Sequence, residues 1–369
     1  MQGGELMKIG ILSMQRIKNY GSFLQAYGLK GIIESLGHEV VFVDYQIEKC
    51  IVDSNDNINP VHKKIIRELK YILRRLYIYV RQGKNKGKKL EVEYNNYLKL
   101  LGITDEYKYR TKVDTLVIGS DEVFNCLQTN KDVGYSKELF GENNKAKRLI
   151  SYAASCGTTT IEGLEKYKIK EEVSSLLRKF DAISVRDNNT GKVVKELTGK
   201  EPYYNLDPVF MYNYDELIPK SIDLKDYVVV YAYSNRITLE EGKYIRDFAK
   251  KHNKKLVCIG AEQKCCEICL KANPFELLAY IKNADYVITD TFHGSVFSIK
   301  YNKLFATIIR NSNKQKLSDL LNRFDLSSRE VSDMNKLEDV LVSDIKYDKV
   351  NEFLDKEINK TIKYLKENL

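Results

Sequence analysis

The sequence of 369 residues has no tryptophan, only five prolines and only four histidines. It also has no hydrophobic run near the roughly 20 residues that a helix needs to cross a bilayer, which argues against a membrane-spanning helix. Residues 1–6 are polar and glycine-rich, so no secretory leader is expected. The seven cysteines are an odd number in a long chain, which suits a reducing compartment better than a disulfide framework. We therefore expect a cytoplasmic protein.

One segment, residues 61–90, accounts for the net charge of +9. It holds eleven lysines and arginines and one acidic residue, Glu68. The pattern in 61–80 predicts a basic amphipathic helix, within an insertion at about 61–110. The helix could be a solvated face, or it could contact an anionic membrane surface from the inner side of the cell membrane. RNA binding is a third interpretation, but no RNA-binding motif accompanies the segment, so no nucleic-acid partner is expected.

Strands and helices alternate along both halves of the chain. We predict strands at 8–13, 40–43, 115–118, 148–153 and 182–185, and then at 227–232, 255–259, 286–289 and 304–309. Such a rhythm is typical of parallel sheets covered by helices. The predicted fold class is therefore α/β, with two Rossmann-like domains that face a cleft. We place these domains at 1–207 and 208–345, and a closing helix at 346–369 that packs back.

The most informative residue is His293. The apolar strand at 286–289 stops at a polar cluster around this histidine, and an apolar helix follows. Ligands bind open α/β sheets at such strand ends, and helix starts favour anions. His293 is therefore a candidate catalytic residue, and Asp290 a second one, although Asp290 could equally be a helix cap.

Four other predicted strands also end in small polar or basic residues. Because such ends meet at one edge of a parallel sheet, they favour a phosphorylated or carboxylated ligand there. Asp121 could instead be a turn residue, and Arg186 a salt-bridge partner of Asp187. The candidate binding residues are Asn19, Gly21, Ser22, Gly119, Ser120, Asp121, Ser155, Thr291, Gly294 and Ser295, and Arg186 is a third candidate catalytic residue.

Six short motifs occur in an order that resembles the polysaccharide pyruvyl transferase family. They are 19–27 (NYGSFLQAY), 117–121 (VIGSD), 150–155 (ISYAAS), 184–187 (SVRD), 206–209 (LDPV) and 289–294 (TDTFHG). The resemblance covers about residues 8–320. It implies a fold like that of GT-B glycosyltransferases.

The resemblance also implies an activity. Members of this family transfer a pyruvyl group from phosphoenolpyruvate to two hydroxyls of a sugar, which forms a cyclic ketal. By motif, His293 would be the general acid and Arg186 would bind the donor. No metal or other cofactor is implied. The acceptor would be a sugar of a cell-surface polysaccharide or of its lipid-linked precursor.

The chain departs from the family pattern at two positions. Many members have arginine where this chain has Thr291, and tryptophan where it has Phe124. Arg310 and Lys316, just past the next strand, could supply the missing cation. The change at Thr291 motivates one alternative, a GT-B glycosyltransferase that uses a nucleotide sugar. A second alternative is a non-catalytic protein that binds glycan or membrane.

The segment 265–269 contains three of the seven cysteines and one C-x-x-C pair. A structural zinc site uses four ligands, and no second pair or histidine cluster follows. We interpret these cysteines as unpaired thiols in a loop, and no metal site is predicted.

Overall fold

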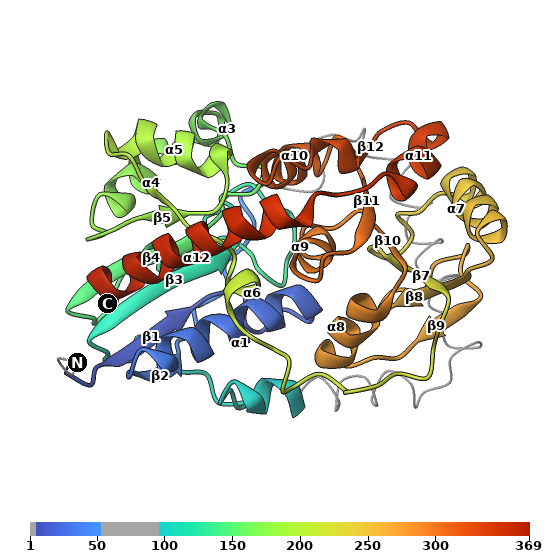
Figure 1. The fold of residues 1–369 in the computed structure, drawn as a ribbon. Helices are drawn as coiled ribbons and strands as arrows, with labels where there is room; N and C mark the ends of the chain where they lie inside the picture. The colour runs from blue at the N-terminus through green and yellow to red at the C-terminus, as the bar shows by residue number, and fades with distance from the viewer. Residues whose placement is uncertain (1–4, 53–95) are drawn as a thin grey trace.

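The computed structural model describes residues 5–52 and 96–369 (Figure 1). The predicted basic helix at 61–80 and most of the insertion lie outside these residues. The described chain contains two six-stranded sheets, and every pair of neighbouring strands is parallel. The α/β fold class predicted from the sequence is therefore confirmed.

The first sheet has the strand order β2-β1-β3-β4-β5-β6. Its four inner strands are almost wholly buried, as is typical of parallel sheets that helices cover, and its two edge strands are partly exposed. The strands are β1 (Lys8–Leu12), β2 (Glu39–Phe42), β3 (Thr115–Asp121), β4 (Arg148–Ala154), β5 (Ser184–Val185) and β6 (Tyr203–Tyr204).

The second sheet has the order β12-β11-β10-β7-β8-β9. Three short strands, β6, β9 and β12, were not predicted. Each has only two or three residues, which is too few to show the alternation of apolar and polar residues that marks a strand. The predicted strand at 182–185 is shorter in the structure. The strands are β7 (Tyr227–Tyr231), β8 (Lys255–Ile259), β9 (Ile268–Leu270), β10 (Tyr286–Thr289), β11 (Leu304–Ile308) and β12 (Glu330–Val331).

Helices cover the faces of the sheets (Figure 1). Residues 96–100 are also helical. The larger helices are α1 (Tyr20–Ser35), α4 (Lys170–Leu177), α5 (Asn188–Thr198), α7 (Leu239–Lys251), α8 (Pro274–Asn283), α9 (Phe292–Lys300), α10 (Lys314–Arg323) and α12 (Tyr347–Asn368). Shorter ones are η1 (Lys137–Phe140), α3 (Ile161–Lys166), α6 (Pro208–Met211), η2 (Ser327–Arg329), η3 (Met334–Lys336) and α11 (Leu337–Val342).

The last helix, α12, leaves the second sheet and packs against the first (Figure 1). The Tyr364 hydroxyl donates a hydrogen bond of 2.7 Å to the Ser151 carbonyl in β4. The Thr115 hydroxyl in β3 donates one of 2.8 Å to the Leu369 carbonyl. These bonds and the burial of Leu365 tie the end of the chain to its beginning.

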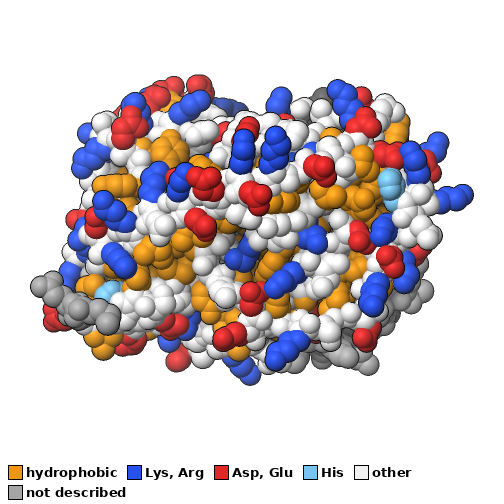
Figure 2. Space-filling model, viewed as in Figure 1, with side chains coloured by type: hydrophobic (Ala, Val, Ile, Leu, Met, Phe, Trp, Pro, Cys, Tyr) orange, Lys and Arg blue, Asp and Glu red, His pale blue; other side chains and the backbone are white. Residues whose placement is uncertain are grey.

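On the face drawn in Figure 2, basic and acidic side chains are interspersed over both halves. Within residues 5–52 and 96–369, no helix combines the length and the apolar character that crossing a bilayer requires.

Candidate active site

His293 lies in the first turn of α9, directly after β10, as the sequence predicts. Thr291 is the N-cap, and its hydroxyl accepts a hydrogen bond of 2.9 Å from the Gly294 backbone N–H. Only 9% of His293 is exposed. A nearly buried imidazole at a helix start has few possible proton partners, so its neighbours define its chemistry.

The carboxylate of Asp207 is the acidic partner of His293. The distance from His293 Nε2 to Asp207 Oδ2 is 3.5 Å, and the same oxygen lies 3.1 Å from Nη1 of Arg186. Asp207 also caps α6, because its other oxygen accepts a hydrogen bond from the Val209 N–H. Burial alone would raise the pKa of Asp207, but His293 and Arg186 together lower it below its ordinary value. Asp207 is therefore ionised and can stabilise a protonated imidazole.

The other ring nitrogen of His293 faces the first turn of α1, which belongs to the other half of the molecule. A Cβ added to Gly21 would lie 2.2 Å from His293 Nδ1. Only glycine allows this approach of the helix to the ring. Asn19 is the N-cap of α1 and accepts a hydrogen bond of 2.8 Å from the Gly21 N–H. The histidine therefore lies where the two halves meet.

Arg186 is the cation next to this histidine. Its side chain is 3% exposed, and its Nη2 lies 3.4 Å from Oδ1 of Asp121. The Ser22 hydroxyl donates a hydrogen bond of 2.8 Å to Oδ2 of the same Asp121. The guanidinium carbon of Arg186 lies 4.1 Å from the centre of the Phe292 ring. Its Nε is buried and has no hydrogen-bond partner.

A hollow with about 300 Å³ of empty space adjoins this cluster. Lys316 reaches it from α10, and its Nζ lies 3.0 Å from Oε1 of Glu122 in the other half. Burial would lower the pKa of Lys316, but Glu122 raises it above its ordinary value, so the ammonium group stays charged. The lining residues are Arg186, Asp187, Leu206, Asp207, Phe210, Phe292, Lys316, Leu320, Arg323 and Phe324.

Asp290 and Arg310 belong to a different group of charges. Asp290 Oδ2 lies 2.7 Å from Nε of Arg236 and 3.5 Å from Nε of Arg310. Burial raises the pKa of Asp290, and the two arginines oppose this rise. Arg310 also binds Glu241 through two hydrogen bonds of 2.8 and 3.0 Å. The structure thus gives both residues ion-pair partners, and their predicted roles at the ligand stay predictions.

The remaining predicted binding residues have packing contacts. The Ser120 hydroxyl donates to the side-chain oxygen of Gln25, and the Ser155 hydroxyl accepts from the Gly157 N–H. The Ser295 hydroxyl lies 3.0 Å from that of Thr307. A Cβ on Gly119 would lie 2.1 Å from the Tyr152 carbonyl oxygen, and one on Gly294 would lie 2.1 Å from the Thr289 hydroxyl. These residues position strand ends and the start of α9.

Sequence reasoning assigned no role to Asp207, Glu122 or Phe292. Asp207 had a signal, since the motif 206–209 was one of the six used for the resemblance. Glu122 directly follows Asp121, but no sequence signal pointed to Glu122 itself.

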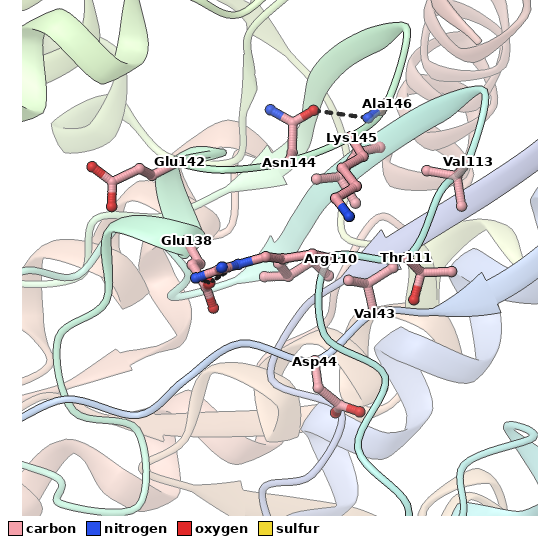
Figure 3. A pocket seen from close by; sticks show the side chains of 12 residues that line it. Val43, Asp44, Arg110, Thr111, Val113, Glu138, Glu142, Asn144, Lys145 and Ala146 are labelled. Atoms are coloured by element: carbon pink, nitrogen blue, oxygen red, sulfur yellow. Dashed lines mark hydrogen bonds and ion pairs between the residues drawn. The ribbon is translucent and has the colours of Figure 1, made fainter.

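A second hollow, of about 320 Å³, lies beside the first sheet (Figure 3). Arg110 and Glu138 line it and are joined by a hydrogen bond of 3.0 Å. None of the predicted site residues lines it. In residues 5–52 and 96–369, no group of three or more histidine, cysteine and acidic side chains has a geometry that would hold a metal ion.

Comparison with known proteins agrees with the motifs. The family model described as polysaccharide pyruvyl transferase matches residues 19–313. The chain belongs to the polysaccharide pyruvyl transferase family. That family is one of transferases. No curated protein matches the chain significantly.

Solved structures show the same fold at low sequence identity. A UDP co-structure of MnaA from S. aureus is 10% identical with a TM-score of 0.51, and the match covers 99% of this chain and 98% of that one. A putative UDP-N-acetylglucosamine 2-epimerase from Listeria monocytogenes is 8% identical with a TM-score of 0.53, covering 98% and 96%. These likenesses show the fold alone, which is the predicted GT-B-like arrangement of two Rossmann-like halves.

Proposed function

We propose that this family member transfers a pyruvyl group from phosphoenolpyruvate to a sugar of a cell-surface polysaccharide or of its lipid-linked precursor. The observation that supports this most is the placement of His293 between Asp207 and Gly21, with Arg186 on the same carboxylate. This arrangement provides an acid, a group that orients it and a cation at the meeting of the two halves.

In the proposed reaction, His293 donates a proton to the methylene carbon of phosphoenolpyruvate, which becomes a methyl group. One sugar hydroxyl attacks the adjacent carbon, where positive charge develops, and loses its proton. A second hydroxyl then displaces inorganic phosphate and also loses its proton, which closes the ketal. Positioned proton transfer of this kind typically contributes about 10²–10⁴-fold to the rate. Asp207 stabilises the imidazolium form that donates.

The donor carries a carboxylate and a phosphate, so its site needs positive charge. Arg186 can offer its unpartnered Nε. Lys316 also lines the hollow, and it pairs with Glu122. We infer that Lys316 exchanges this carboxylate for the phosphate when the donor binds. A lipid-linked acceptor would bring the reaction to the inner face of the cell membrane, where the basic segment 61–90 could bind anionic lipid.

The test incubates the protein with phosphoenolpyruvate and lipid-linked or model glycosides, and measures phosphate release and ketal formation by NMR. His293→Gln should lower the rate by about 10²-fold or more, which is the scale of a lost general acid. His252→Gln is the matched control, because His252 pairs with Glu338 elsewhere. Turnover with a nucleotide sugar instead of phosphoenolpyruvate would contradict the proposal.

A second pair of variants tests the position of the ring. Gly21→Ala would place a methyl group 2.2 Å from His293 Nδ1. Gly31→Ala, in the same helix, would place one 2.2 Å from the Tyr212 ring instead. Both should cost stability of similar size, but only Gly21→Ala should abolish ketal formation. Equal activity of the two folded variants would contradict the assigned role of His293.

A further inference from the structure

The helix α10 presents one polar face to the other half of the molecule. Lys316, Asp319 and Arg323 follow each other at intervals of three and four residues, so they lie on the same face of the helix. The ammonium group of Lys316 pairs with Glu122 of the first half. The carboxylate of Asp319 accepts a hydrogen bond of 3.1 Å from the Asn188 backbone N–H. Arg323 is the third member of this face, and neither the sequence motifs nor the proposed reaction gives it a role.

The guanidinium group of Arg323 donates to three backbone carbonyls of the first half. Its Nη1 lies 3.2 Å from the carbonyl oxygen of Asn205 and 3.5 Å from that of Arg186. Its Nη2 lies 3.3 Å from the carbonyl oxygen of Tyr204. These carbonyls stand where β5 and β6 end, and Asp207 follows two residues after Asn205. One planar group with several donors therefore joins the two strand ends that carry the cation and the carboxylate of the candidate site.

Arg323 is itself anchored by the last helix, α12. Its Nη2 forms an ion pair with Oε2 of Glu357, and the two side chains are only 19% and 14% exposed. One turn further along α12, the Thr361 hydroxyl donates a hydrogen bond of 2.8 Å to the Glu357 carbonyl. The same hydroxyl accepts one of 3.4 Å from the backbone N–H of Leu206, the residue before Asp207. The helix α12 therefore supports this strand end directly and also fixes the direction of the arginine.

We propose that Arg323 is a positioning residue for Arg186 and Asp207, and that Glu357 holds Arg323 in place. This inference rests on the proposed function, in which Arg186 binds the donor. Arg323 lines the same hollow, but both of its Nη atoms are engaged with carbonyls and with Glu357. It therefore acts through the backbone of the strand ends and not on the donor. The donor site in the first half is complete only while α10 lies against it.

The variant Arg323→Lys separates the shape of this side chain from its charge. Lysine keeps a positive charge for Glu357, but a compact ammonium group cannot span two strand ends as a planar guanidinium does. We expect the variant to fold and the KM for phosphoenolpyruvate to rise about tenfold, while kcat falls by a smaller factor. Arg178→Lys is the matched control, because Arg178 donates to the Leu197 carbonyl, which does not line the hollow. Steady-state kinetics of phosphate release measure both constants.

Hydrogen exchange of the whole protein tests the same positioning without any donor. Backbone amides in 184–188 and 204–207 should exchange faster in Arg323→Lys than in the wild type, and Arg178→Lys should leave them unchanged. Glu357→Gln should act in the same direction by a smaller factor, because glutamine still accepts a hydrogen bond but carries no charge. Glu352→Gln, in the same helix, is its control, since Glu352 forms an exposed pair with Lys356.

Three results would overturn the positioning role of Arg323. One is unchanged hydrogen exchange at both strand ends in Arg323→Lys. Another is faster exchange throughout the molecule, which would make Arg323 a general stabilising residue. The third is a KM for phosphoenolpyruvate that stays at the wild-type value. If the wild type itself does not bind phosphoenolpyruvate, the proposed function fails, and the exchange at the two strand ends still decides whether Arg323 positions them.

Discussion

Asp207 is the residue that joins His293 and Arg186 in the candidate site. Its Oδ2 faces both His293 and Arg186, and its Oδ1 caps α6. A carboxylate with several partners holds the imidazole and the guanidinium in fixed positions. It therefore acts as a positioning residue for His293.

Replacement of this carboxylate should affect stability in a way that depends on pH. Asp207→Asn leaves Arg186 buried without one of its partners, which typically costs about 3–5 kcal/mol. Because the folded-state pKa of Asp207 is lowered, its stabilisation is present above the ordinary pKa and is lost as pH falls through the folded-state value.

Urea unfolding at neutral and at strongly acidic pH measures this effect. The difference in unfolding free energy between wild type and Asp207→Asn should be large at neutral pH and should shrink in acid. Asp132→Asn, at an exposed position, is the control and should change little. If the difference in unfolding free energy grew in acid, the pKa of Asp207 would be raised in the folded state and not lowered.

At the scale of elements, α9 and α10 bring the site together. The strand, turn and helix around His293 were predictable from an apolar strand followed by an apolar helix, but the cap of this helix is Thr291 and not Asp290. The helix α10 was not predicted, although Leu317, Leu320 and Leu321 have helical spacing and are all buried. It reaches the other half through Lys316 and through Asp319, whose carboxylate accepts a hydrogen bond of 3.2 Å from Asn188.

Because Lys316 pairs with Glu122, we expect replacing the lysine and replacing the glutamate to have opposite effects on donor binding. Lys316→Met should weaken phosphoenolpyruvate binding by about tenfold, the scale of one lost charge-assisted contact. Glu122→Gln should strengthen binding, because Lys316 no longer has to leave a carboxylate. Isothermal titration with phosphoenolpyruvate measures both.

The matched control for this pair is Lys254→Met, since Lys254 pairs with Asp226 and Asp285 away from the hollow. It should leave donor binding unchanged. Weaker binding in Glu122→Gln would show that Glu122 orders the site and does not compete with the donor.

At the scale of the whole molecule, one hydrophobic cluster runs through both halves. It contains Ile9 and Val117 of the first sheet, Val229 of the second and Leu365 of α12. The two sheets therefore share this core, and each also has a hydrophobic cluster of its own. A chain built in this way should unfold with strong coupling between its halves.

Leu365→Ala tests this coupling. Leu365 is fully buried, so its truncation should lower the unfolding free energy by about 2–5 kcal/mol. Urea unfolding followed by circular dichroism should show one transition at a lower urea concentration. Leu239→Ala is the control, because Leu239 is 69% exposed. Loss of only part of the signal at low urea would mean that α12 stabilises the first half alone.

The sequence by itself determined most of the strands and helices, and it singled out His293 as the central residue of the candidate site. Apolar runs that alternate with helical patterns form buried parallel strands, and polar residues stand directly after these runs. The α/β class and the position of His293 at a strand end were therefore predictable. Local patterns also explain α8, since Asn273 caps its start and Pro274 lies in its first turn. Such features depend on neighbours in the chain, which a sequence displays directly.

Only the tertiary structure decided which side chains share the site. Asp207 is 86 residues from His293 in the chain, and Gly21 is 272 residues away. Strand order and the packing of the two halves bring them together, and they direct Asp290 to Arg236 and Arg310 instead. No local period encodes such contacts, because they result from how separate elements bury their apolar faces against each other.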